Sequence, residues 1–229
     1  MKISFSTLAC PDFAWKDIYS MAKDFGFDGI EIRGLGNEIF SVNAQPFKKE
    51  QLPKTIEKLK SLNIEISCLT SGACLKYKDK LDDIKAEITA YAELANKLDC
   101  SYIRVLGDTD PAPSGEVDDE YVAEALKEII PIAEEYNVTL LIETNGVYSD
   151  TARLARLLDK VKSRKVSALW DMHHPYRYNN ESPETTVSNL GEYIKYIQVK
   201  DSIIDENGNV KYKIIGTGDI PVKEMIKAL

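Results

Sequence analysis

The sequence predicts an α/β protein whose βα units form a (β/α)8 barrel of the TIM type. Short apolar runs alternate with longer segments of helical spacing along the whole chain. Seven such units follow at a pitch of roughly 30 residues, which is typical of parallel strands joined by right-handed crossovers. The alternative is a doubly wound sheet, which should carry a glycine-rich turn after its first strand. Residues 8–12 contain no glycine there, and Gly34-Leu35-Gly36 lacks the third glycine, so the barrel is favoured.

The predicted elements follow this alternation in order. Strands are expected at residues 3–8, 29–33, 64–69, 102–106, 138–142, 166–170 and 197–200. Helices are expected at residues 15–25, 50–62, 80–98, 116–136, 151–161 and 184–193. A hairpin with its tip at 205–209 joins residues 203–204 to 210–215, and a short amphipathic tail spans 222–229.

No linker or low-complexity segment divides the chain, so a single domain over residues 1–229 is expected. Three irregular segments, residues 107–115, 175–183 and 202–221, each follow a predicted strand. In a barrel the loops after the strands form the active-site face. We therefore expect functional side chains in or just before these segments.

Composition limits the classes of partner. Asp and Glu exceed Lys and Arg by 37 to 29, and a formal net charge of -8 argues against nucleic acid or an anionic membrane. No stretch approaches the roughly 18 apolar residues of a membrane-spanning helix, and the N-terminus lacks a cleavable signal pattern. Four cysteines, three of them in or near apolar runs, have no CxxC spacing and are expected to be reduced. These features predict a cytoplasmic protein.

Polar side chains gather at the ends of the predicted strands, and a barrel would bring those ends together. Carboxylates and an imidazole at one face are ligands for a divalent metal such as Mn, Mg, Zn or Co. Each residue also has a structural interpretation, as a buried ion pair or a surface pair. Because adjacent side chains point in different directions, the two histidines are not both expected to face one metal. The residues concerned are Glu31, Arg33, Glu143, Asp171, His173, His174, Gln198, Lys200 and Asp201.

Five segments occur in an order that resembles the xylose isomerase-like TIM barrel superfamily, the sugar phosphate isomerases and epimerases. They are residues 27–32, 141–143, 171–174, 196–201 and 216–221. The resemblance covers nearly the whole chain. Each motif alone is weak, but together they indicate the superfamily and not one reaction within it.

The resemblance implies a site with one divalent metal. Glu143 and Asp171 fall on two metal ligands, with Glu143 also the general base, and His174 falls on a substrate contact that also serves catalysis. Gln198 falls on the third ligand, because this chain reads QVKD where the family has HxKD. An amide oxygen is a weaker ligand than an imidazole for zinc. The family's fourth ligand, a glutamate after the eighth strand, has no counterpart before Leu229, so one divalent metal is expected and its weak binding or absence is the alternative.

The function expected is therefore a metal-dependent isomerase or epimerase of a small sugar or sugar phosphate. It would abstract a proton next to a carbonyl and form an enediolate, with Glu31, Arg33, His174 and Lys200 contacting the substrate. The alternatives are an impaired barrel that binds a sugar or a partner protein, and a dehydratase on the same scaffold. A C-terminally short barrel without its eighth unit leaves two unpaired strand edges, which either another chain, as in a homo-oligomer, or a shifted tail would need to cover.

Overall fold

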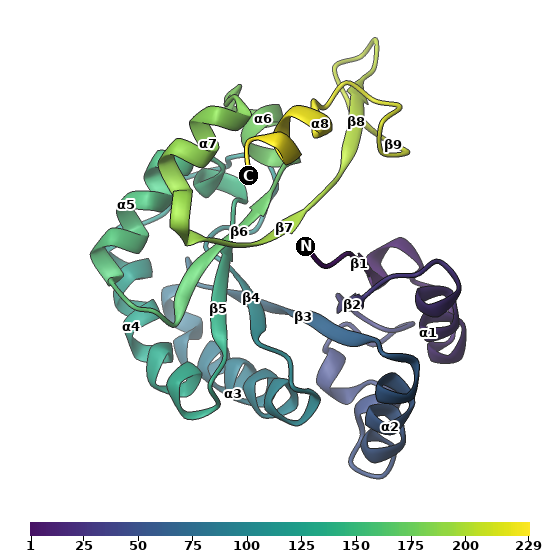
Figure 1. The fold of residues 1–229 in the computed structure, drawn as a ribbon. Helices are drawn as coiled ribbons and strands as arrows, with labels where there is room; N and C mark the ends of the chain where they lie inside the picture. The colour runs from purple at the N-terminus through teal and green to yellow at the C-terminus, as the bar shows by residue number, and fades with distance from the viewer. The chain divides into compact units, whose positions relative to one another are not determined.

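The computed structural model describes residues 1–229, and strands and helices alternate along it as the sequence predicts (Figure 1). Seven strands form one sheet in chain order, β1-β2-β3-β4-β5-β6-β7, and the β1–β2, β2–β3 and β6–β7 pairs are parallel. This order confirms the α/β class and the barrel-type succession of βα units. The strands are β1 Ser4–Ser6, β2 Gly29–Ile32, β3 Glu65–Cys74, β4 Tyr102–Leu106, β5 Thr139–Glu143, β6 Val166–Asp171 and β7 Ile194–Gln198.

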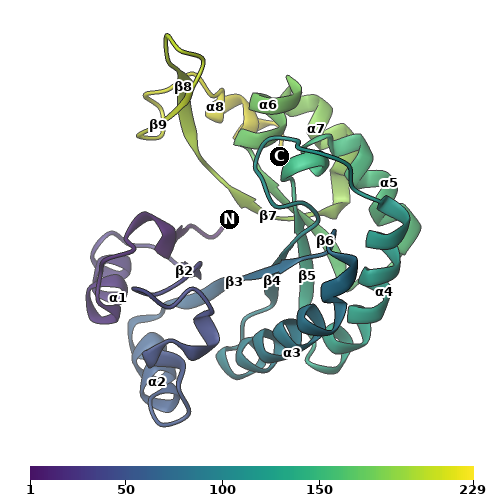
Figure 2. The same ribbon diagram turned by 180° about the vertical axis from the view of Figure 1, so that it is seen from behind.

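The helices alternate with these strands, as the view from behind also shows (Figure 2). They occupy most of the ranges predicted from the sequence. Two further strands form the separate antiparallel hairpin that the sequence predicted, β8 Asp201–Ile204 and β9 Val210–Lys213. The helices are α1 Trp15–Asp24, α2 Leu52–Leu62, α3 Leu81–Leu98, α4 Asp119–Glu135, α5 Thr151–Val161, α6 His173–Asn179, α7 Pro183–Leu190 and α8 Val222–Lys227.

The chain forms two compact units and passes between them within β3, β4, α4 and β5 and also between Lys78 and Asp79. Unit 1 contains residues 1–73, 79–105 and 128–140, and unit 2 contains residues 74–78, 106–127 and 141–229. In unit 1, helices end at a left-handed residue and lead directly into the next strand. Asn63, Asp99 and Asn137 adopt positive φ there, and the residue after each donates its N–H five residues back into the helix. These caps set where each following strand begins.

Unit 2 holds the functional segments, and its core packs around the end of β6. Trp170, Met172, Ile220, Val222 and Met225 form a buried cluster against which Ile194, Ile197 and Val199 pack. Side chains alternate across a strand, so Gln198, next to Ile197 at the end of β7, is directed to the opposite face. The apolar residues of α8 therefore cover the face of this segment that carries Ile197.

Some boundaries differ from the sequence prediction. β7 spans Ile194–Gln198 and not residues 197–200, so Lys200 lies beyond the strand, and β3 runs on to Cys74. Helix α6 occupies His173–Asn179, part of which was expected to be irregular because of Pro175. Pro175 is the third residue of α6, where a backbone N–H has no partner within the helix, so the proline is tolerated.

All four cysteines are buried and free. No helix in the structure combines the length and the apolar character that crossing a membrane requires.

Candidate functional site

Asp171 lies at the end of β6, completely buried, and the ends of β5 and β7 hold its backbone from both sides. The Thr144 hydroxyl accepts a hydrogen bond from the Asp171 N–H at 2.9 Å and donates to the Asp171 carbonyl at 3.1 Å. On the other side Asp171 pairs with Gln198 in the β6–β7 register, and the Met172 N–H donates to the Gln198 carbonyl. The backbone from which the Asp171 carboxylate extends is thus fixed in position.

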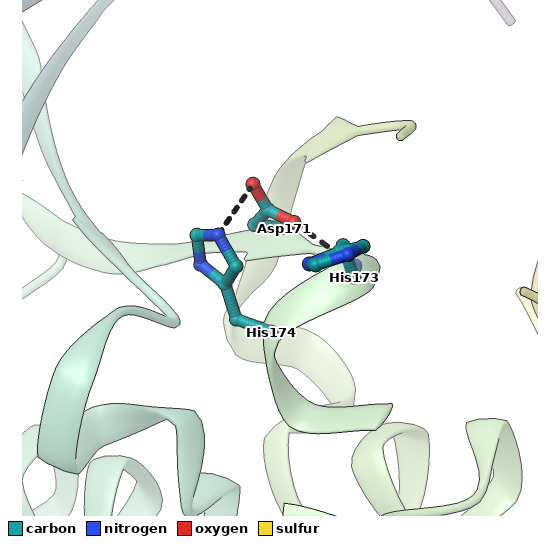
Figure 3. Close-up of side chains that lie close together, drawn as sticks. All are labelled: Asp171, His173 and His174. Carbon is teal, nitrogen blue, oxygen red and sulfur yellow. Dashed lines mark hydrogen bonds and ion pairs between the residues drawn. The ribbon is translucent and has the colours of Figure 1, made fainter. Parts of the chain in front are cut away.

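The two histidines follow at the start of α6, and their rings lie on either side of Asp171 (Figure 3). The His173 N–H donates to Asp171 Oδ1 at 2.9 Å, so this carboxylate also satisfies the first turn of the helix. His174 Nε2 lies 3.6 Å from Asp171 Oδ2. Both rings are buried, with centroids 5.6 Å apart. A short helix beginning directly after β6 therefore concentrates two imidazoles beside one buried carboxylate.

Glu143 and Lys200 complete the charges around these rings. Glu143, buried at the end of β5, places Oε1 3.9 Å from His174 Nδ1, and the Lys200 ammonium contacts Asp171 Oδ2. Burial raises the pKa of Asp171, but the charges of His174 and Lys200 outweigh it and hold that pKa below its usual value. Burial lowers the pKa of Lys200, but Asp171 and Glu143 outweigh that effect and raise it. The pair is therefore ionised near neutral pH.

Several residues around His173 were not identified from the sequence. The Ser202 hydroxyl lies 2.9 Å from His173 Nε2, and it accepts a hydrogen bond from Arg177 at 2.8 Å. The Tyr212 ring, from β9, lies 5.5 Å from the His173 ring. Burial lowers the pKa of His173 to about 4, so this imidazole is neutral at neutral pH. The sequence predicted the hairpin that carries Ser202 and Tyr212, but nothing in it showed that the hairpin reaches His173.

Asp201 has a structural task that explains a second motif. Its buried carboxylate accepts hydrogen bonds from four backbone N–H groups, those of Ser202, Gly216, Gly218 and Ile220. A Cβ at Gly218 would lie 2.1 Å from Asp201 Oδ1, so only glycine allows this approach. Lys200 and Asp201 are therefore not a surface pair. Lys200 pairs with Asp171, and Asp201 anchors the loop of residues 214–220.

The structure thus brings four of the residues singled out from the sequence into one cluster: Glu143, Asp171, His174 and Lys200. Gln198 is adjacent to Asp171 through the strand register. Glu31 and Arg33 belong to unit 1. There Glu31 is buried in β2 opposite Ser6 and Cys68, and the Arg33 N–H donates to Thr7 Oγ1.

The sequence matches a family model described as xylose isomerase-like TIM barrel over residues 20–229. The chain belongs to this family. The match covers β2 to α8 and includes every residue of the cluster. No curated protein sequence matches the chain.

Solved structures share the fold of this xylose isomerase-like barrel at low sequence identity, and each match covers 100% of the present chain. A protein described as the IOLI protein with a binding zinc atom has 18% identity, a TM-score of 0.81 and 84% of its own chain covered. The probable 3-DHS dehydratase AsbF from Bacillus anthracis has 20% identity, a TM-score of 0.80 and 88% covered. D-psicose 3-epimerase with D-tagatose from Clostridium cellulolyticum H10 has 19% identity, a TM-score of 0.78 and 80% of its own chain covered.

The residues of this xylose isomerase-like barrel fit a divalent metal ion. Asp171, His173 and His174 each offer one ligand atom, and these atoms lie within 4.8 Å of one another. His174 Nε2 is buried and has no hydrogen-bond partner. A buried ring nitrogen that has no hydrogen-bond partner and lies near a carboxylate oxygen leaves a position that a cation can occupy between the two atoms. Glu143 adds a second carboxylate on the other side of the His174 ring.

Proposed function

We propose that this chain is a divalent-metal-dependent isomerase or epimerase of a small sugar or sugar phosphate. The observation that supports the proposal is the pair of buried carboxylates, Glu143 and Asp171, on either side of His174. Buried carboxylates are costly unless cations or hydrogen bonds compensate them. Membership in a family whose solved neighbours include sugar 3-epimerases supports the substrate class.

The metal, held by Asp171, Glu143 and the Gln198 amide oxygen, would polarise adjacent carbonyl and hydroxyl oxygens of the sugar. Glu143 removes the proton from the carbon beside the carbonyl, and its return to the neighbouring carbon completes an isomerisation. An epimerisation instead needs a proton delivered to the opposite face of the same carbon, for which water is the donor. Lys200 binds a hydroxyl or phosphate oxygen of the substrate, because its raised pKa keeps the ammonium charged. Glu31 and Arg33 stay proposed substrate contacts on the family resemblance alone.

The test follows proton exchange and does not require the product to be known. Protein loaded with Mn²⁺ is incubated in D₂O with a panel of ketoses, aldoses and their phosphates, and the substrate C–H signals are followed by NMR. We expect exchange at the carbon next to the carbonyl of at least one sugar. Glu143→Gln should abolish the exchange while circular dichroism stays unchanged. Metal-loaded protein that exchanges no member of the panel contradicts the proposal.

A dehydratase on the same scaffold is the second candidate, and a specific observation favours it: the probable 3-DHS dehydratase covers this chain completely with a TM-score of 0.80. A dehydratase would use the same base to remove the proton but then expel a β-hydroxyl group. Mass spectrometry of the same incubation separates the two reactions, because a dehydration product has lost one water and an isomerisation product has not.

An impaired barrel that only binds a ligand is the third candidate. Two features favour it, the amide of Gln198 in place of an imidazole and the Lys200 ammonium on Asp171. Such a protein would bind a sugar in the NMR panel without exchanging any of its protons.

A further inference from the structure

The position and proton of the His174 ring are set by a neighbouring backbone group. His174 Nδ1 lies 3.1 Å from the Thr144 carbonyl oxygen. A carbonyl oxygen can only accept, so Nδ1 must carry the proton and donate it. The Thr144 backbone is itself fixed, because its N–H donates to the Leu169 carbonyl at 3.0 Å. The ring therefore sits in one tautomer and one orientation.

With the proton on Nδ1 engaged by Thr144, Nε2 is the open position of the ring. His174 is only 2% exposed, Nε2 has no hydrogen-bond partner, and it faces Asp171 Oδ2 at 3.6 Å. A lone pair and a carboxylate facing each other in a buried site repel, so either a second proton, which makes the ring a charged imidazolium, or a metal ion must lie between these two atoms. With a metal ion on Nε2, His174 could no longer donate a proton to a substrate oxygen.

The separation of these two atoms suits a shared metal ion. Nitrogen and oxygen ligands lie about 2.1 Å from a tetrahedral zinc ion, so two of them are roughly 3.4 Å apart. The 3.6 Å between His174 Nε2 and Asp171 Oδ2 is close to that value. Gln198, which is level with Asp171 in the neighbouring strand, offers only an amide group.

We propose that His174 is a direct ligand of the metal through Nε2, sharing the ion with Asp171. The proposal rests on the proposed metal-dependent function. It makes His174 the imidazole ligand of a site in which β7 contributes a glutamine. Proton donation to the substrate oxygens then falls to Lys200, whose ammonium already lies against Asp171.

His173 is the competing imidazole, because its Nδ1 is also buried without a hydrogen-bond partner, but the rest of its surroundings differ. Its Nε2 lies beside the Ser202 hydroxyl, which can either donate or accept, so that partner does not fix the His173 tautomer. The His173 ring also packs against the rings of Tyr178 and Tyr212. We assign it a structural role that links α6 to the hairpin.

The chain has only two histidines, which makes the assignment testable by spectroscopy. Protein grown with ¹⁵N-histidine is loaded with Mn²⁺, and pulsed EPR measures the ¹⁵N hyperfine coupling to the ion. Loss of the free Mn²⁺ EPR signal gives the affinity in parallel. We expect a coupling typical of a directly bound nitrogen in the unmodified protein and in His173→Gln, and none in His174→Gln.

The affinity should follow the same pattern. Removing even an outer partner of a ligand costs roughly 10–100-fold in metal affinity, so His174→Gln should weaken Mn²⁺ binding at least about tenfold. His173→Gln should bind Mn²⁺ like the unmodified protein.

The outcomes separate the two levels of the argument. Bound Mn²⁺ without ¹⁵N coupling, or a coupling that His173→Gln removes and His174→Gln leaves intact, overturns the role of His174 and leaves the metal-dependent function standing. If the unmodified protein binds no Mn²⁺, both fail. The unmodified protein alone shows whether a histidine nitrogen binds the ion, so that result stands even if a variant does not fold.

Discussion

At the scale of single residues, Lys200 and a metal ion compete for the same oxygen of Asp171. Asp171 Oδ2 contacts the Lys200 ammonium and also faces His174 Nε2. Two cations cannot share one carboxylate oxygen without strong repulsion. A bound metal must therefore move the ammonium away from this oxygen, towards the place where substrate oxygens would bind.

This competition predicts the effect of Lys200→Met. Without the ammonium, Mn²⁺ has no charge to displace, and its dissociation constant should fall roughly tenfold, which corresponds to one pKa unit of interaction. Isothermal titration calorimetry with Mn²⁺ measures this. Lys195→Met, which removes an exposed lysine of β7, should leave the constant unchanged. Weaker binding in Lys200→Met would show that the lysine supports the metal and does not compete with it.

Thr144 provides a second prediction at this scale. Thr144→Val keeps the shape of the side chain but removes the hydroxyl that bonds both the N–H and the carbonyl of Asp171. These backbone groups are buried, so we expect a loss of about 1–3 kcal/mol in the free energy of unfolding, measured with urea. The exposed Thr185→Val, at the start of α7, should cost less. Equal losses would mean that Thr144 does not fix Asp171.

The sequence predicted the charged part of this cluster but not its supports. Glu143, Asp171 and His174 were identifiable because polar residues directly after buried apolar strands are costly without a partner. Thr144 and Ser202 could not be identified, because their roles depend on which atoms lie within 3 Å after folding. The pairing of Lys200 with Asp171, and not with its neighbour Asp201, follows from side-chain direction beyond β7, which a sequence pattern does not specify.

At the scale of elements, the loop of residues 214–220 depends on one carboxylate. Asp201 accepts hydrogen bonds from three backbone N–H groups of that loop, those of Gly216, Gly218 and Ile220, and from the N–H of its neighbour Ser202. The loop leads into Ile220 and α8, whose apolar residues cover Trp170 and Met172 below Asp171. By fixing this loop, Asp201 thus stabilises the apolar cluster that packs around the end of β6.

The anchor gives a pH-dependent prediction. Burial raises the pKa of Asp201, but the backbone N–H groups outweigh it and hold the pKa below its usual value. A depressed folded-state pKa contributes stability above the unfolded value, near 3.9, which is lost as the pH falls through the folded value. Asp201→Asn should therefore cost about 2 kcal/mol at pH 7 and progressively less below about pH 4.

Urea unfolding at several pH values measures this difference against the unmodified protein. Asp205→Asn is the matched control, because Asp205 also accepts backbone N–H groups but at the exposed hairpin tip. The backbone N–H of Asn209 lowers the pKa of Asp205 as well, so we expect a change of the same sign and pH trend there, but a smaller one because solvent screens these bonds. A cost for Asp201→Asn that persists unchanged at pH 3 would assign its effect to packing and not to charge.

Helix α6 shows why element boundaries near the site were the weakest part of the sequence prediction. The run His173-His174-Pro175 has no apolar periodicity and contains a proline, so it was expected to be irregular from Pro175 onwards. The structure uses a tertiary contact instead: Asp171 Oδ1 accepts the His173 N–H and starts the helix. Local propensity could not indicate a helix that begins on a carboxylate of the preceding strand.

At the scale of the whole molecule, the alternation of elements was sufficient to predict the class of fold. Seven parallel strands in chain order and a family match over residues 20–229 confirm it. This result depends on periodicity repeated over many residues, which tolerates errors of a few residues at each boundary. The reaction is not predictable in the same way, because related barrels with similar folds carry epimerase and dehydratase names.

Global stability should report whether the metal site exists. A ligand that binds only the folded state stabilises it by RT ln(1 + [L]/Kd), about 2.7 kcal/mol at one hundred times the dissociation constant. We expect saturating Mn²⁺ to raise the melting temperature of the unmodified protein and a chelator to reverse the rise. Asp171→Asn should lose the response, because it removes the carboxylate that faces His174, while Asp12→Asn, at an exposed position, should keep it. A rise of the same size in Asp171→Asn would place the bound metal elsewhere on this acidic chain, where carboxylates outnumber cationic side chains by 37 to 29.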